Sequence, residues 1–288
     1  MSNDSASPSL PQELIDQLIE ERRKHHVPSQ LRPLAQQFVQ QALGVLFPHF
    51  APTVVCNEDA VREDLIQLEE SLRRLERSIA TLHEAMPERL VERFFAALAE
   101  VHRRLADDAQ AIFEGDPAAK SVDEVVLTYP GFFAIAVFRI ANLLHRLGLP
   151  LLPRLLTEVA HEKTGIDLHP GATIGRRFCI DHGTGIVIGE TTHIGDGVKL
   201  YQGVTLGALT VEKGLADAKR HPTIGDEVVI YAGATILGGQ TSVGHHSIIA
   251  GNAFVTSSVP ANSVVTRKND VRPRSSGASM FDDVDFVI

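Results

Sequence analysis

Cysteine, positive charge and long apolar runs are all scarce in this chain of 288 residues. Its two cysteines, Cys56 and Cys179, are too few for a disulfide framework, so a reducing, cytoplasmic environment is expected. Lysine and arginine number 27 against 36 aspartate and glutamate residues, which argues against nucleic-acid binding, because phosphate backbones need clustered cations. Apolar runs stay shorter than the roughly 18 residues of a membrane span, so no membrane partner is expected.

The first part of the chain has helical periodicity. Residues 1–12 are polar, with two prolines and no basic segment before an apolar one, and we expect a disordered tail without a secretion signal. Over residues 13–163 apolar side chains recur at helical spacing, with prolines between the segments, which predicts an all-α helical domain. The apolar run Phe132–Leu149 is interrupted by Arg139 and His145, so it is interpreted as a buried amphipathic helix.

A six-residue period replaces the helical one after Gly165, together with more glycine and β-branched residues. Aliphatic or small residues recur at Leu168, Ile174, Ile180, Ile186, Thr192, Val198 and Val204, then at Ile224, Ile230 and Ile236, and after a slip of one residue at Val243, Ile249 and Val255. This period predicts a triangular solenoid over residues 164–265, in which residues about 18 apart stack and the aliphatic of each unit points inward. A β-sandwich is disfavoured, because its turns would come every 8–12 residues.

Two segments interrupt or follow the repeat. Residues 207–221 are mostly polar and break the period, so they are predicted to form a loop beside which a substrate site is expected. Residues 266–288 form a tail that ends in the acidic stretch FDDVDFVI and closes on Ile288.

A carboxylate and an imidazole are expected to meet on the solenoid. Asp167 and His182 are almost one turn of the predicted coil apart, which places them on neighbouring strands. The Asp167 carboxylate would accept the imidazole N–H and fix the tautomer, and the other ring nitrogen would then take a proton from a hydroxyl. Histidine suits this task because its ordinary pKa is near neutral pH.

These stretches resemble the serine O-acetyltransferases, hexapeptide-repeat enzymes that open cysteine biosynthesis. The resemblance spans about residues 116–270, and its motifs are GDPAA, YPGFFAIAVFRIANLLH, TGIDLHPGATIG, DHGTGIVIGET, GVTLG and RHPTIGD, in that order. It implies an α+β fold of segregated parts, with the helical domain followed by a left-handed parallel β-helix. The loop before Arg220 is longer than the glycine-rich loop of known members.

The resemblance also implies roles for individual residues. Asp167 and His182 would form the catalytic dyad, with His221 as a second active-site histidine. Arg220 would hold the substrate carboxylate, and Asp116 and Asp181 would contact its amino and hydroxyl end. Coenzyme A binding is assigned to Gly207, Ala208, Ala232 and Gly251, and backbone N–H groups near the first two are expected to stabilise the tetrahedral oxyanion.

Further implications concern substrates and partners. Acetyl-coenzyme A would be a co-substrate, with no permanently bound cofactor and no metal, and L-serine would be the acceptor. The family assembles trimers or dimers of trimers, with active sites between neighbouring solenoids. In this family a C-terminal isoleucine such as Ile288 often inserts into O-acetylserine sulfhydrylase, and a chance last residue on a disordered tail is the equally weighted alternative.

Other functions remain open at this level. Some hexapeptide proteins are zinc-dependent hydratases with three histidine ligands, for which His182, His193 and His221 are the available candidates. An acetyltransferase acting on a sugar, an antibiotic or another small hydroxyl acceptor would use the same solenoid and histidine base. A catalytically silent scaffold is disfavoured by the intact Asp167–His182 pair. The aspartate spacing and the RHP motif favour base catalysis on serine.

Overall fold

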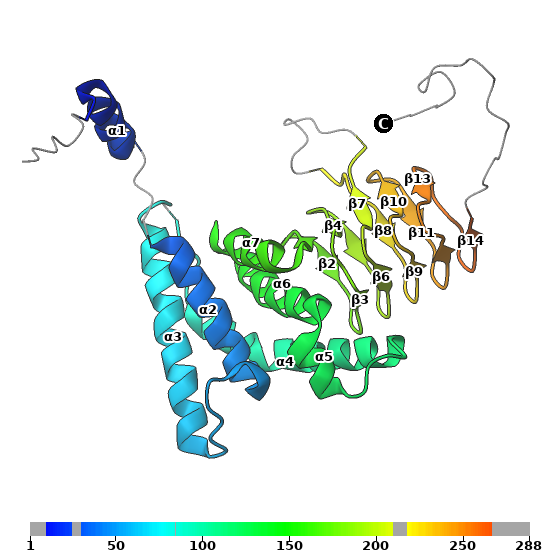
Figure 1. Cartoon of the computed structure of the whole chain (residues 1–288), viewed down its shortest axis with the longest axis horizontal. Coiled ribbons are helices and arrows are strands. Elements are labelled where there is room, and N and C mark those ends of the chain that lie inside the picture. The colour runs from blue at the N-terminus through cyan, green and yellow to red at the C-terminus, as the bar shows by residue number, and fades with distance from the viewer. Residues whose placement is uncertain (1–9, 25–29, 84, 210–217, 267–288) are drawn as a thin grey trace, which may run out of the picture.

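Helices occupy the first part of the chain and a stack of short strands the second (Figure 1). The computed structural model describes residues 10–24, 30–83, 85–209 and 218–266. The predicted tail with Ile288, apart from residue 266, lies outside the described residues, and so do residues 1–9. Helix α1 starts at Gln12, so the predicted N-terminal tail is one residue too long at its end.

The helices follow the predicted periodicity. They are α1 (Gln12–Lys24), α2 (Leu31–Leu46), the 3₁₀ turn η1 (Pro48–Phe50), α3 (Glu58–Ala80), α4 (Leu90–Gly115), α5 (Val122–Thr128), α6 (Pro130–Arg146) and α7 (Leu152–Thr164). Side chains cap two of them: Asn57 accepts from the Ala60 N–H at the start of α3, and Ser121 accepts from the Glu124 N–H at the start of α5. Gly165, at φ 69°, ends α7 and turns the chain into the first strand.

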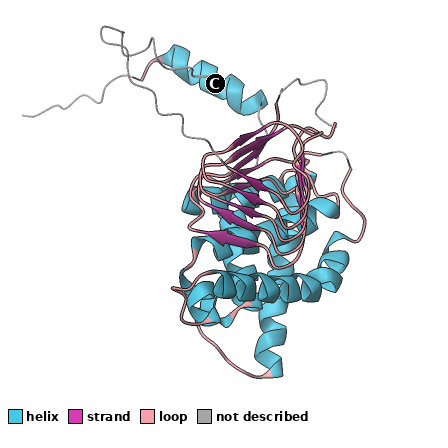
Figure 2. Ribbon diagram, turned by 90° about the vertical axis from the view of Figure 1, so that its right-hand side faces the viewer, coloured by secondary structure: helices cyan, strands magenta, loops and turns pink. Residues whose placement is uncertain are grey.

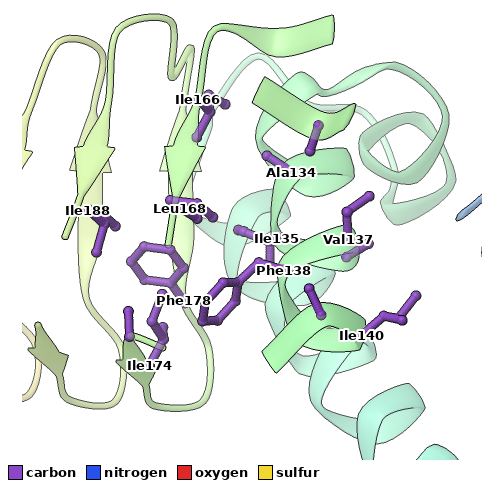
Figure 3. Close-up of a cluster of buried hydrophobic side chains, with 14 of the residues drawn as sticks. Ala134, Ile135, Val137, Phe138, Ile140, Ile166, Leu168, Ile174, Phe178 and Ile188 are labelled. Atoms are coloured by element: carbon purple, nitrogen blue, oxygen red, sulfur yellow. The ribbon is translucent and has the colours of Figure 1, made fainter. Parts of the chain in front are cut away.

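Helix α6 is the centre of the helical part and joins it to the solenoid. Most of its side chains are buried, as expected for the apolar run. Figure 3 shows Phe138 of α6 beside Phe178 and Leu168 of the first coil. At the start of the helix, a Cβ on Gly131 would lie 2.5 Å from the Ile180 carbonyl oxygen, so only glycine allows α6 to approach the strand this closely.

A buried ion pair ties α4 and α6 to the same coil. Arg139 donates through Nε and Nη2 to the two carboxylate oxygens of Asp108, at 2.9 and 3.0 Å. The guanidinium also donates to the Ile174 and Gly175 carbonyls, and Asp108 accepts from the Phe178 N–H. Each polar side-chain atom of this buried pair therefore has a hydrogen-bond partner.

The solenoid consists of three parallel sheets stacked around an apolar interior (Figure 2). Sheet A contains β1 (Asp167–Leu168), β4 (Val187–Ile188), β7 (Thr205–Gly207), β10 (Thr235–Leu237) and β13 (Phe254–Val255). Sheet B contains β2 (Thr173–Ile174), β5 (His193–Ile194), β8 (Thr223–Ile224) and β11 (Ser242–Val243). Sheet C contains β3 (Cys179–Asp181), β6 (Lys199–Tyr201), β9 (Val229–Ile230), β12 (Ile248–Ile249) and β14 (Val264–Val265).

The coils do not all have the predicted length of three six-residue units. Asp167 pairs with Val187, and Val187 pairs with Thr205, so the first coil is two residues longer than the second, which has the predicted length. Thr205 pairs with Thr235, and this coil is much longer than the others because the predicted excursion 207–221 falls between β7 and β8. Beyond it, Thr235 pairs with Phe254, one residue past the predicted length, as the predicted slip requires.

The side chains that point into the solenoid were therefore predicted wrongly between Ile180 and Leu206. The strand residues that point inward continue from Ile180 to Ile188, Ile194, Leu200 and Leu206. The predicted series Ile186 to Val204 is also buried, but it lies in the turns two residues earlier. The cause is a turn with two extra residues between Ile180 and Ile188, and this turn carries His182.

Within the described ranges, no single helix has both the length and the apolar composition that a membrane crossing requires. Helices α5 and α6 meet the requirement only as a pair, and they are bent by 77° at their junction.

Candidate active site

The predicted site residues lie along two different edges of the solenoid. We call the turns that lead from sheet C to sheet A the C–A edge, and those that lead from sheet A to sheet B the A–B edge. Asp181 ends β3, and His182 follows it in the turn to β4, at the C–A edge. Arg220 and His221 lie at the A–B edge, immediately before β8.

His182 projects into solvent from the irregular turn. Its side chain is 76% exposed, and its backbone has φ 58°, a value that disfavours most residues other than glycine. Gly183 and Gly185 in the same turn also have positive φ. The strained, widened turn thus presents the imidazole outside the stack, where a substrate can reach it.

The predicted hydrogen bond between Asp167 and His182 is absent from the described part of the chain. Asp167 instead accepts from Arg154 Nη1 at 3.0 Å. Because the first coil is longer than predicted, Asp167 stacks against Val187, well past His182 in the chain. The carboxylate beside the ring is that of Asp181, with Oδ1 3.9 Å from His182 Nε2, beyond hydrogen-bonding distance.

Asp116 comes to the C–A edge from the helical part. It follows the last residue of α4, and its carboxylate accepts from the Tyr129 hydroxyl at 2.6 Å and from the Ala118 N–H at 2.8 Å. The Tyr129 hydrogen bond lowers the pKa of Asp116, and the nearby charges of Lys199 and His182 lower it further. The same bond raises the pKa of Tyr129 to about 12. Asp116, Asp181 and His182, which the family resemblance assigned to one site, therefore lie at the same edge of the solenoid.

Lys199 lies among Asp116, Asp181 and His182, and it was not predicted from the sequence. Its Nζ is 2.9 Å from Asp181 Oδ2 and donates to the Gly115 carbonyl oxygen at 2.6 Å. No motif marked this lysine, because its two partners come from another coil and from a helix much earlier in the chain.

His221 is buried at the A–B edge, with 8% of the residue exposed. Its Nδ1 accepts from the Thr191 N–H at 3.0 Å, which assigns the proton of the neutral ring to Nε2. Burial, reinforced by the charges of Arg220 and Lys219, lowers the pKa of His221 to about 4. A Cβ on Gly189 would lie 2.1 Å from this ring, so a glycine is required beneath it. His221 is thus a neutral hydrogen-bond donor at neutral pH.

The segment around Arg220 is held rigidly. The Arg220 guanidinium pairs with Glu190, and its backbone N–H donates to Thr191 Oγ1 at 3.0 Å. Lys219 Nζ donates to the carbonyl oxygens of Thr191, His221 and Pro222. Although burial alone would raise the pKa of Glu190, the bond from Arg220 brings it below its usual value. Glu190 and Thr191 end the DHGTGIVIGET motif noted in the sequence, where neither was given a role.

The residues assigned to coenzyme A are also divided between the two edges. Gly207 ends β7 and Ala208 follows it at the A–B edge, whereas Ala232 and Gly251 lie in successive turns of the C–A edge. These two turns stack, since the Asn252 N–H donates to the Ala232 carbonyl oxygen at 2.8 Å.

The three histidines considered as zinc ligands do not converge within the described residues of one chain. His182 is at the C–A edge, His193 is exposed in β5, and His221 is buried with its Nδ1 bonded to Thr191. Nor do the described residues contain a group of three or more His, Cys, Asp or Glu side chains placed to hold a metal ion.

A cavity of about 590 Å³ between α2, α3 and η1 shares no residue with either edge.

Fold and site together define a β-solenoid of the hexapeptide-repeat class that presents a histidine from a turn. A family model described as "Serine acetyltransferase, N-terminal" matches residues 53–137. The chain is 50% identical over 163 residues to a serine acetyltransferase of Bacillus subtilis, a match that covers 57% of this chain and 73% of that protein. The chain belongs to the serine acetyltransferase family.

Other relatives extend the comparison. A plasmid-borne serine acetyltransferase of Synechococcus elongatus is 52% identical over 183 residues, covering 62% of this chain and 57% of that protein. Serine acetyltransferase 1 of Entamoeba histolytica, solved with L-cysteine, superposes with a TM-score of 0.72 at 31% identity, covering 82% of this chain and 98% of that chain. A serine acetyltransferase solved with CoA has a TM-score of 0.56 at 26% identity, covering 88% of each chain. The likeness therefore includes the helices as well as the solenoid.

Proposed function

We propose that this protein transfers the acetyl group of acetyl-coenzyme A to the hydroxyl of L-serine, giving O-acetylserine for cysteine biosynthesis. The observation that carries the proposal is the exposed imidazole of His182 beside two carboxylates, Asp116 and Asp181. This arrangement offers a base for a hydroxyl and an anionic environment for an ammonium group, the two features that serine combines. The names of the matched relatives agree with it.

In the proposed mechanism, His182 accepts the serine hydroxyl proton while the oxygen attacks the thioester carbonyl. A tetrahedral oxyanion forms, and backbone N–H groups near Gly207 and Ala208 are expected to stabilise it. The carbon–sulfur bond then breaks, and the departing thiolate takes the proton from His182, which releases coenzyme A as a thiol. Asp116 and Asp181 hold the serine ammonium, and Arg220 holds its carboxylate. His221 donates a hydrogen bond from its Nε2–H toward the reacting oxygens and stays neutral.

We further propose that each active site is shared between two copies in a homotrimer. His182, Asp116 and Asp181 gather at the C–A edge, whereas Arg220 and His221 gather at the A–B edge on the other side of sheet A. A molecule as small as serine needs both groups around it. If the C–A edge of one copy faces the A–B edge of the next, the base and the carboxylate anchor meet, and so do the two halves of the predicted coenzyme A site. The pairing of Asp167 with His182 stays a prediction from the family resemblance, since within one chain the Asp167 carboxylate accepts from Arg154 instead.

Activity is tested by thiol release from acetyl-coenzyme A with serine, homoserine and a panel of sugars. We expect serine to be the preferred acceptor, and preference for a sugar would contradict the proposal.

The shared site is tested by co-expressing His182→Asn and Arg220→Ala chains with different tags and purifying the mixed trimers. Each variant alone is expected to be nearly inactive, whereas mixed trimers regain activity because one interface combines an intact His182 with an intact Arg220. Mixed trimers without activity would show that each site belongs to one chain.

Two further proposals concern location and partner. A cytoplasmic location is supported by the unpaired state of Cys56 and Cys179, and burial raises the pKa of the Cys179 thiol to about 12, which keeps it inert. Binding of O-acetylserine sulfhydrylase through Ile288 is proposed from the terminal residue alone. Deleting Ile288 is expected to abolish capture of the sulfhydrylase in a pull-down, and unchanged capture would refute it.

A further inference from the structure

Lys199 connects the helical part of the acceptor site with the solenoid. It lies on β6, and only 14% of its side chain is exposed. Its ammonium contacts three groups: the Asp181 carboxylate at 2.9 Å, the Gly115 carbonyl oxygen at 2.6 Å, and the Tyr201 ring, whose centroid is 4.5 Å away. One side chain therefore engages a strand of sheet C and the end of α4 at once.

The Gly115 contact matters because of the residue that follows. Gly115 ends α4, and Asp116 comes directly after it. Tyr129 and the Ala118 N–H fix the Asp116 carboxylate, and both of these partners belong to the helical part rather than to the strand that carries Asp181. Within the described residues, the recorded polar link between the end of α4 and Asp181 is the Lys199 ammonium. The Asp108–Arg139 and Glu114–Arg177 pairs hold α4 against the first coil, and Lys199 adds the direct link between Gly115 and Asp181 that aligns the two carboxylates.

The charge of Lys199 also balances the site. Asp116 and Asp181 carry like charges that repel each other when no cation lies between them. Although burial alone would lower the pKa of Lys199, the hydrogen bonds to Tyr201 and Asp181 outweigh it and raise the pKa above its usual range. The ammonium is thus charged throughout the neutral range. It offsets one carboxylate and leaves the site with a single net negative charge, which matches one ammonium on the acceptor.

We propose that Lys199 is a positioning residue of the acceptor site, which aligns Asp181 with Asp116 and thereby sets the preference for hydroxyl acceptors that carry an ammonium group. The inference rests on the proposed function. It concerns ground-state binding of the acceptor rather than the proton transfer at His182. Its effect is therefore expected in KM for serine, whereas kcat should change little.

The test compares Lys199→Met with the wild type on serine and on 3-hydroxypropionate, which has the hydroxyl and carboxylate but no ammonium. Product is counted from radiolabelled acetyl-coenzyme A, so that slow acceptors register. Because hydrogen bonds to charged groups are among the strong ones, we expect KM for serine to rise about tenfold or more, with kcat within about threefold. Turnover of 3-hydroxypropionate should stay within about twofold, so that discrimination between the acceptors falls. Lys199→Arg should restore part of the loss.

A matched control is Lys163→Met, which removes another lysine that lies over an aromatic ring, that of Phe133 at 5.3 Å. It should leave both acceptors unaffected. If Lys199→Met does not fold, Lys199→Gln retains a donor for the Gly115 carbonyl without the charge, and the same loss of discrimination is expected. Equal losses with both acceptors would reveal a merely structural lysine, and unchanged kinetics would equally overturn the inference. A wild-type protein that does not acetylate serine would instead refute the proposed function.

Discussion

At the scale of single residues, two histidines of one chain occupy opposite environments. His182 stands in solvent on a strained turn, and its ring is accessible to a substrate. His221 is buried against Gly189 with its Nδ1 bonded to Thr191, so it stays neutral and donates through Nε2. Environment, rather than residue type, thus separates the exposed ring that we propose for proton transfer from the buried ring that we propose for hydrogen bonding.

Replacing His182 with Asn is expected to lower kcat for serine by about 10²–10⁴, the usual contribution of a general base. The circular dichroism spectrum and the oligomeric state should not change, because the exposed ring contributes little to packing. Thiol-release kinetics provide the measurement, and Lys163→Met serves as the control. A variant with full activity would remove His182 from the mechanism.

The buried His221 predicts a pH dependence of stability. Its pKa is about 4 in the folded protein against a usual value of 6.5, so between these values the unfolded chain binds a proton that the folded chain does not. The free energy of unfolding should therefore decrease as pH falls from 7 to 5, and it should decrease less in His221→Asn. Urea unfolding at both pH values measures the difference, with His193→Asn, on the exposed face of β5, as the control. Equal decreases in the wild type and His221→Asn would contradict the assignment.

At the scale of secondary-structure elements, the position of the acceptor site depends on how α4 and α6 meet the first coil. Asp116 belongs to α4, whereas Asp181 and His182 belong to the coil. The glycine contact at Gly131 and the buried pair Asp108–Arg139 set this junction. A shift of α4 along the solenoid would separate the two carboxylates, because Asp116 moves with the helix.

Replacing Arg139 with Met is expected to cost about 3–5 kcal/mol of unfolding free energy, because it leaves the Asp108 charge buried without a cation to pair with. The Ile174 and Gly175 carbonyls also lose their donor. Urea unfolding measures the loss. Arg62→Ala breaks an exposed ion pair with Glu58 and should remain close to the wild type. A similar small effect in both variants would mean that the junction does not depend on the pair.

At the scale of the whole molecule, α1 contributes little to the fold of one chain. It has no buried residue, and Figure 1 shows it apart from the other helices. Helix α2, in contrast, buries Ala35, Phe38 and Leu43 in the shared core. The helical core that supports the acceptor site therefore begins at α2.

Removing residues 1–29 is accordingly expected to leave the melting temperature and serine kinetics unchanged. Removing residues 1–50 exposes the apolar surface that α2 covers, which should lower the melting temperature sharply or cause aggregation. Differential scanning fluorimetry distinguishes the two truncations. If the shorter truncation already lowers the melting temperature, α1 must pack against another copy of the chain.

Much of the site was predictable from local sequence. His182 was proposed as a base from its spacing to Asp167, and Asp116 and Asp181 were proposed because their motifs, GDPAA and DHGTGIVIGET, resemble those of a known family. The contacts of Asp167 were not predictable, because a bulge at the His182 turn lengthens the first coil and pairs Asp167 with Val187. Lys199 and Arg154 were missed for a related reason, since their partners lie on helices or other coils.

The sequence by itself determined the period of six and the break at the 207–221 excursion, because each depends on residues close together in the chain, and its resemblance to a known family supplied the candidate site residues. Only the tertiary structure decided which side chains meet, which edge of the solenoid each occupies and which imidazole is buried. Those outcomes depend on the register of the coils and on how α4 and α6 pack against the first coil. They arise from contacts between residues that are tens of positions apart in the sequence.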